Sequence, residues 1–157
     1  MPVIGVDISG QVGSNPPVYA VAVKLRREEQ YHHIVCLTPA RHDEYRSSAR
    51  NWCEKLSAIL IYKATLELYN SGDAIVIDVD FMGNRRIRIE NCLKTLFGTR
   101  FLGQHPLNDP NILFVPPRLN IHVKKAHVKS RLARHRGIAA DLKDPDLSDE
   151  FDWLEKL

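Results

Sequence analysis

Val3-Ile4-Gly5-Val6-Asp7-Ile8-Ser9-Gly10 and Ala74-Ile75-Val76-Ile77-Asp78-Val79-Asp80 are two short apolar stretches that carry carboxylates. Both are rich in β-branched residues, so both predict buried strands. A carboxylate in such a strand is costly unless it is paired, hydrogen-bonded or bound to a cation. Two such strands side by side would bring oxygen ligands together. We therefore expect a site for a hard divalent cation, Mg²⁺ or Mn²⁺.

The bulk composition predicts one globular domain. The chain has 157 residues, a formal net charge of +3 and three cysteines. No apolar run is long enough to span a bilayer, and a strand begins almost at once where a signal peptide would lie, so we expect no membrane partner. Cys36, Cys53 and Cys92 lack CxxC spacing and lie in apolar segments. They predict buried free thiols and a reducing, cytoplasmic compartment.

Periodicity and turn residues divide the chain into strands and helices. Apolar runs predict five strands, which are Val3–Ile8, Val18–Leu25, Tyr31–Leu37, Ala74–Asp80 and Asn111–Val115. Apolar residues at helical spacing predict helices between His42 and Tyr69, from Asn84 to Phe97 with Gly98 past its end, and from Ile121 to Arg136 with Gly137 past its end. A short helix is expected around Phe151.

The order of these elements predicts an α/β fold. Three sequential strands form a meander, and two further strands are reached through helical crossovers. This arrangement gives a mixed five-stranded sheet (βββαβαβα) with helices on both faces. We expect residues 1–140 to form this domain and residues 141–157 to form an acidic C-terminal tail.

The element order resembles that of the ribonuclease H-like superfamily, over residues 1–136. In that superfamily the first and fourth strands run side by side, and each supplies an acid to a site that usually binds magnesium or manganese. The resemblance implies that Asp7, Asp78 and Asp80 are metal ligands and catalytic residues.

Local motifs resemble particular branches of this superfamily. The stretch from Gly5 to Gly13 resembles the opening of type 2 ribonuclease H, although Ile8 occupies the position of a metal-binding Glu. Lys125-Ala126-His127 is similar to a Lys-Ala-Asp stretch of those enzymes, with His127 at the acid position. The opening also resembles the GxDxG start of Holliday junction resolvases and of related ribosomal-RNA nucleases, some of which use a histidine on the last helix. The overall pattern resembles small archaeal proteins predicted to belong to the superfamily.

The candidate ligands leave several alternatives open. Asp78 and Asp80 are two residues apart on a strand and so face the same side. Both could therefore lean toward Asp7, and the sequence does not choose between them as the principal ligand. The alternative is that one of the pair caps the helix that begins at Asn84 or holds the strand end by backbone hydrogen bonds. Glu54 is the candidate for a fourth ligand, with Asp43 and Glu44 nearer the start of the helix. For each of these three, a solvated acid on a helix face is the alternative.

His127 is a candidate catalytic residue on the last expected helix. A neutral imidazole accepts a proton or binds a metal near neutral pH. The alternative is a solvent-exposed histidine on a basic helix.

The same helix is strongly basic. From Arg118 to Arg136 there are seven cations and no acid. This density of positive charge is typical of a surface that binds phosphates. We therefore expect nucleic-acid contacts from Lys124, Lys125, Lys129, Arg131, Arg134 and Arg136. An ordinary solvated face is the alternative. A stripe of small residues, Val123, Ala126, Ser130 and Ala133, is expected to pack on the sheet.

Two further charged segments have open roles. The acidic tail would cover the basic helix, dock a partner protein, or supply a ligand from Asp141 or Asp144. Arg85, Arg86 and Arg88 begin an expected helix, where cations are unfavourable, so we expect a local phosphate or carboxylate partner. The alternative is partial neutralisation by Glu90 and solvent.

Together these features predict a divalent-metal-dependent nuclease that hydrolyses phosphodiester bonds in RNA, an RNA–DNA hybrid or branched DNA. The alternative is a catalytically inactive ribonuclease H-like protein that binds nucleic acid or acts as a scaffold, and Ile8 favours it. An actin-like ATPase is excluded, because that architecture needs two such domains.

Overall fold

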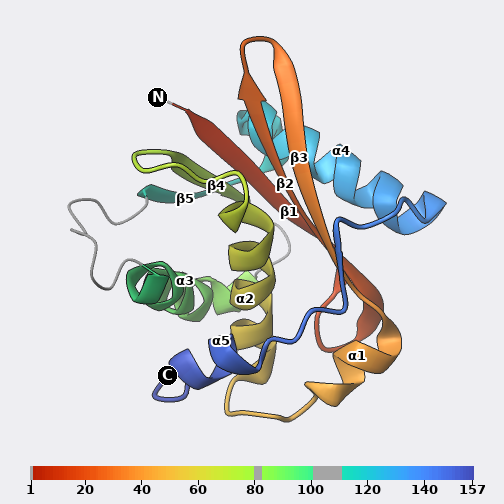
Figure 1. The fold of residues 1–157 in the computed structure, drawn as a ribbon, viewed down its shortest axis with the longest axis vertical. Coiled ribbons are helices and arrows are strands. Elements are labelled where there is room, and N and C mark those ends of the chain that lie inside the picture. Colours follow the sequence, from red (N-terminus) through yellow and green to blue (C-terminus); the bar gives the residue numbers. More distant parts are fainter. Residues whose placement is uncertain (1, 80–82, 101–110) are drawn as a thin grey trace.

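The computed structural model describes residues 2–79, 83–100 and 111–157 and contains one mixed sheet (Figure 1). Its strand order is β5-β4-β1-β2-β3-β6. The strands are β1 Val3–Gln11, β2 Asn15–Arg26, β3 Glu29–Leu37, β4 Ala74–Asp78, β5 Asn111–Val115 and β6 Leu142–Lys143. The first three form an antiparallel meander, and β4, β5 and β6 run parallel to β1, β4 and β3, respectively.

Helices cover both faces of this sheet (Figure 1). They are α1 Pro39–Glu44, α2 Trp52–Leu66, α3 Arg86–Arg100, α4 Ile121–Arg136 and α5 Ser148–Trp153, with short 3₁₀ turns at Gly83–Arg85 and Pro117–Leu119. One face packs with α2 and α3 in the main hydrophobic core. The other face packs with α4 in a smaller cluster around Val21, Val23 and Ile34. No helix in the described part of the chain has the length and hydropathy needed to cross a bilayer.

Alternation along β1 decides which side chains face α4. Ile4, Val6 and Ile8 point into the main core, so Gly5 and Asp7 lie on the α4 side. A Cβ atom on Gly5 would lie 2.2 Å from the backbone carbonyl carbon of His122 in α4. Glycine at this position is therefore what lets α4 cross directly over β1, next to Asp7.

The expected small-residue stripe of α4 is confirmed. Val123, Ala126 and Ala133 are fully buried, as is Ser130. The side chain of Asn120 accepts hydrogen bonds from the first backbone N–H groups of the helix, and Gly137 ends it with a φ of +64°. The bounds predicted from the sequence are those observed.

Two predictions about the elements are wrong. The sheet has six strands rather than five, because Leu142 and Lys143 pair with β3. The helix expected between His42 and Tyr69 is confirmed as α2, and the short α1 before it was not predicted; Ser47 and Asn51, with φ of +57° and +56°, lie between the two. Gly98 lies inside α3 rather than past its end. Burial of the α3 apolar face carries the helix through this glycine, because packing outweighs a propensity cost of about 1 kcal/mol.

The segment 141–157 is integrated into the fold. Asp141 accepts a hydrogen bond from the Ile34 backbone at 2.8 Å, and Asp144 accepts bonds from the backbone and hydroxyl groups of Thr38 at 2.8 and 2.9 Å. Leu147 and Leu154 are fully buried in the main core. Helix α5 packs against α2 and α3, on the face opposite α4. The acidic helix therefore does not cover the basic one.

Candidate metal centre

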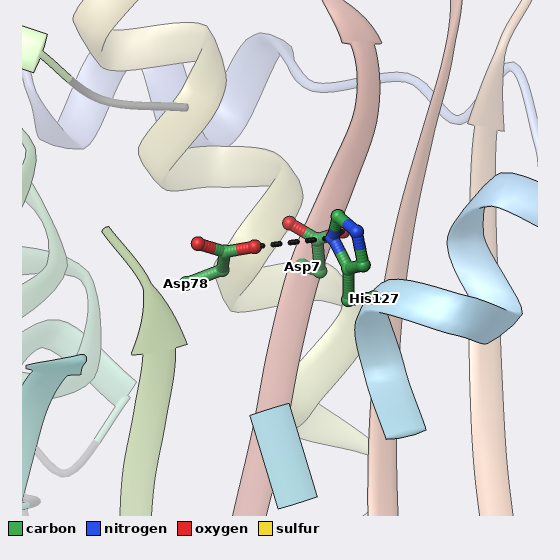
Figure 2. A group of neighbouring side chains, drawn as sticks. All are labelled: Asp7, Asp78 and His127. Carbon is green, nitrogen blue, oxygen red and sulfur yellow. Dashed lines mark hydrogen bonds and ion pairs between the residues drawn. The ribbon is translucent and has the colours of Figure 1, made fainter. Parts of the chain in front are cut away.

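Asp7 and Asp78 lie side by side at the carboxyl ends of two parallel strands. The register of β1 with β4 pairs Val6 with Ile77, so the next residue of each strand is an aspartate. Both are buried, with 3% and 2% of their surface exposed. Figure 2 shows the two carboxylates on neighbouring strands, with a dashed line joining Asp78 to the imidazole of His127, which lies next to Asp7.

His127 reaches this pair from α4. Its Nδ1 atom lies 3.2 Å from Oδ2 of Asp7 and 3.3 Å from Oδ2 of Asp78. The three residues each offer a ligand atom, and these atoms lie within 4.8 Å of one another. The His127 side chain is 30% exposed. It therefore connects two buried acids to solvent.

Ser130 completes the hydrogen bonding of Asp7, and the sequence interpretation missed this role. Its hydroxyl donates to Oδ2 of Asp7 at 2.7 Å, from a position one helical turn after His127. The signal in the sequence was the spacing, because residues three apart share a helix face. Ser130 was expected only to pack on the sheet. A hydroxyl next to a buried carboxylate fixes the orientation of that carboxylate.

The pKa of Asp7 is raised from its ordinary value of 3.8 to about 8. Burial is the largest cause, and the neighbouring Asp78 carboxylate adds to it, whereas the Ser130 hydrogen bond opposes it. The metal-free site therefore favours the protonated form of Asp7 over the charged form more than solvent does. A bound cation would take the place of that proton.

The three residues open into a cavity of about 470 Å³. Its other walls are the β1–β2 turn region and the last turns of α4, through Ser9, Gly10, Asn15, Arg131, Arg134 and His135. Two arginines thus stand beside two carboxylates. Nε of Arg134 is buried without a hydrogen-bond partner among the described residues, and it lies close to Gly10.

Asp80, the third predicted strand ligand, falls outside the described residues. The other predicted ligands lie elsewhere. Glu54 lies on α2, in a small pocket with Arg88, and is not part of the three-residue group. Asp43 pairs with Arg46, and Glu44 pairs with Arg41. Asp141 and Asp144 bind the backbone of β3 and the residue after it.

The structure divides the cations of α4 into separate groups. Arg131 and Arg134 line the cavity of the acids. Lys124, Lys125 and Lys129 line a different groove, together with the apolar side chains of Ile121, Val128 and Leu132. Arg136 is exposed at the end of the helix. The two arginines are therefore the cations that lie closest to the candidate metal centre.

Comparison with known proteins matches this chain to no family model and to no curated protein sequence. The chemistry of the site is thus judged from its donor set. Carboxylate oxygens suit Mg²⁺ and Mn²⁺, and an imidazole nitrogen suits transition metals. Two carboxylates and one imidazole fit a divalent cation.

Proposed function

We propose that this chain is a divalent-metal-dependent phosphodiester hydrolase that acts on RNA, an RNA–DNA hybrid or branched DNA. The observation that carries the proposal is the pair of buried carboxylates, Asp7 and Asp78, in an open cavity that also contains Arg131 and Arg134. The strand order β5-β4-β1-β2-β3, with an antiparallel meander next to parallel β4, supports the ribonuclease H-like architecture that the sequence resembles.

In this proposal Asp7 and Asp78 hold Mg²⁺ or Mn²⁺. A bound divalent ion makes water a better nucleophile and stabilises negative charge on the phosphate oxygens. Arg131 and Arg134 bind the phosphate backbone, since guanidinium groups form paired hydrogen bonds with phosphate. They orient the scissile bond over the acids.

His127 and Ser130 support this arrangement in different ways. His127 contacts both carboxylates and solvent, so it binds the cation or carries a proton between the site and bulk water. Ser130 donates to one oxygen of Asp7 and keeps that carboxylate turned toward α4. Ser130 is therefore a positioning residue.

The alternative is a nucleic-acid-binding protein without catalysis. It is favoured by Ile8, which is buried in the main core at the position next to Asp7 where type 2 ribonuclease H has an acid. It is also favoured by the internal contacts of Asp7 with His127 and Ser130, which satisfy the carboxylate without a metal.

The deciding experiment is a cleavage assay on labelled single-stranded RNA, RNA–DNA hybrid, duplex DNA and four-way-junction DNA, with Mg²⁺ or Mn²⁺. Wild type is compared with Asp78→Asn and with Asp152→Asn, a matched change at an exposed acid of α5. We expect metal-dependent cleavage by wild type and Asp152→Asn but not by Asp78→Asn. Binding without cleavage in all three proteins supports the non-catalytic alternative, and neither binding nor cleavage contradicts both.

A further inference from the structure

A second, smaller pocket lies between α2 and α3. It has a volume of about 110 Å³ and shares no lining residue with the cavity of the acids. Its lining consists of two cations, two carboxamides, one acid, one thiol and one terminal leucine, namely Lys55, Arg88, Asn51, Asn91, Glu54, Cys92 and Leu157. The titratable side chains thus favour a negatively charged ligand.

Lys55 is the unusual residue of this pocket. Only 2% of its surface is exposed, and no hydrogen bond or ion pair of its ammonium group is seen within the described part of the chain. Its Nζ is not among the described polar atoms that are shut off from solvent without a partner, so the little surface that Lys55 exposes includes the ammonium group. The other deeply buried lysine, Lys24, binds the carboxylate of Asp73 and the carbonyl oxygen of Leu68. The Lys55 ammonium therefore reaches the pocket without the anionic partner that Lys24 has.

Two helices begin at this pocket. Lys55 is the fourth residue of α2, and Arg88 is the third residue of α3. The N-cap of α2, Asn51, makes no side-chain capping hydrogen bond, and its Oδ1 instead accepts from Nη1 of Arg88 at 3.1 Å. No acid lies in the first turn of α3. The partial positive charge of both helix N-termini adds to the charge of the two side chains.

We propose that this pocket binds a phosphate group, with Lys55 as its buried anchor and Arg88 at its exposed rim. A water molecule takes up about 30 Å³, so the pocket accepts one small anion and leaves any attached sugar or base in solvent. A bound phosphate would also offset the unfavourable position of Arg85, Arg86 and Arg88 at the start of a helix. Its source is either inorganic phosphate or the backbone of a nucleic acid.

The first test measures thermal unfolding without divalent metal, in phosphate and in chloride of equal ionic strength. For wild type we expect the midpoint to rise with the logarithm of phosphate concentration. Lys55→Met should not respond to phosphate, because it removes the ammonium group that would bind the anion. Lys94→Met, at an exposed lysine of α3 that pairs with Glu90, should respond as wild type does.

Two results would overturn the proposal. One is a wild-type midpoint that does not change with phosphate. The other is a full phosphate response in Lys55→Met. If that variant does not fold, Arg88→Gln at the exposed rim must weaken the phosphate response several-fold, and an unchanged response contradicts the proposal.

A second measurement separates the two sources of phosphate and rests on the proposed function. It follows the binding of a fluorescent single-stranded oligonucleotide without metal. Competition by inorganic phosphate and weaker binding by Lys55→Met identify the nucleic-acid backbone as the source. Oligonucleotide binding that is unaffected by Lys55→Met identifies inorganic phosphate. Asp78→Asn should keep the phosphate response, so failure of the metal centre and failure of this pocket are distinguishable.

Discussion

Replacing Asp7 by Asn should stabilise the metal-free protein, and the gain should grow with pH. The carboxyl group is 3% exposed, and its pKa is raised from 3.8 to about 8 by burial and by Asp78. Asparagine has nearly the same shape, still accepts the hydrogen bond of Ser130, and never ionises. The substitution therefore removes the cost of keeping this buried carboxyl group protonated at a pH where the unfolded chain would ionise it, and it leaves the packing intact.

The magnitude follows from linkage between protonation and folding. Between pH 3.8 and 8 the folded protein holds the Asp7 proton and the unfolded chain does not, so unfolding releases a proton and stability falls as pH rises. Each pKa unit corresponds to about 1.4 kcal/mol. The slope flattens as pH approaches 8, because the folded-state carboxyl group begins to ionise there, so from pH 6 to pH 8 the advantage of Asp7→Asn over wild type should increase by about 2 kcal/mol and then level off.

The assay is urea unfolding in chelator at pH 6, 7 and 8, with the free energy of unfolding compared between the two proteins at each pH. Asp152→Asn, at an exposed acid, controls for the loss of one carboxylate. Asp73→Asn is the contrasting case, because Asp73 is equally buried but pairs with Lys24. Its loss should destabilise the protein by about 3–5 kcal/mol.

A constant difference between wild type and Asp7→Asn across this pH range would refute the reasoning. It would mean that Asp7 ionises in the folded state without penalty.

Further predictions concern the elements around the site. Mn²⁺ should raise the wild-type melting temperature, and His127→Ala should weaken this effect by lowering the affinity for the metal. Gly5→Ala should lower the free energy of urea unfolding by about 1–3 kcal/mol or more and weaken metal binding, because the added Cβ would overlap the α4 backbone. Ser130→Ala should raise the pKa of Asp7 further, seen as a shift of the pH dependence of metal binding to higher pH. Asp144→Ala should cost about 1–3 kcal/mol in the same unfolding assay, because two hydrogen bonds to Thr38 are lost.

The strands and the acid pair were predictable because side-chain direction in a strand has a period of two. Once β1 and β4 were recognised as neighbours, alternation alone placed Asp7 and Asp78 on one face. The sixth strand was not predictable, because two residues carry no periodic signal. It depends on Asp141 and Asp144, whose carboxylates bind the backbone of Ile34 and Thr38, and such contacts between distant segments leave no local pattern.

Helix rotation explains why the helical ligands were harder to predict than the strand ligands. A strand residue can point to only two faces, whereas a helix residue can point in any direction around the helix axis. Only the packing of the helix determines that direction. On α4 the close approach at Gly5 sets that rotation, so His127 and Ser130 meet Asp7, while Lys124 and Lys129 turn away from it. On α2 the buried apolar residues turn Glu54 toward α3 and Arg88 rather than toward the acids. The candidate metal centre therefore consists of two acids from strands and one histidine from a helix. The position of this histidine depends on Gly5, which lies in β1.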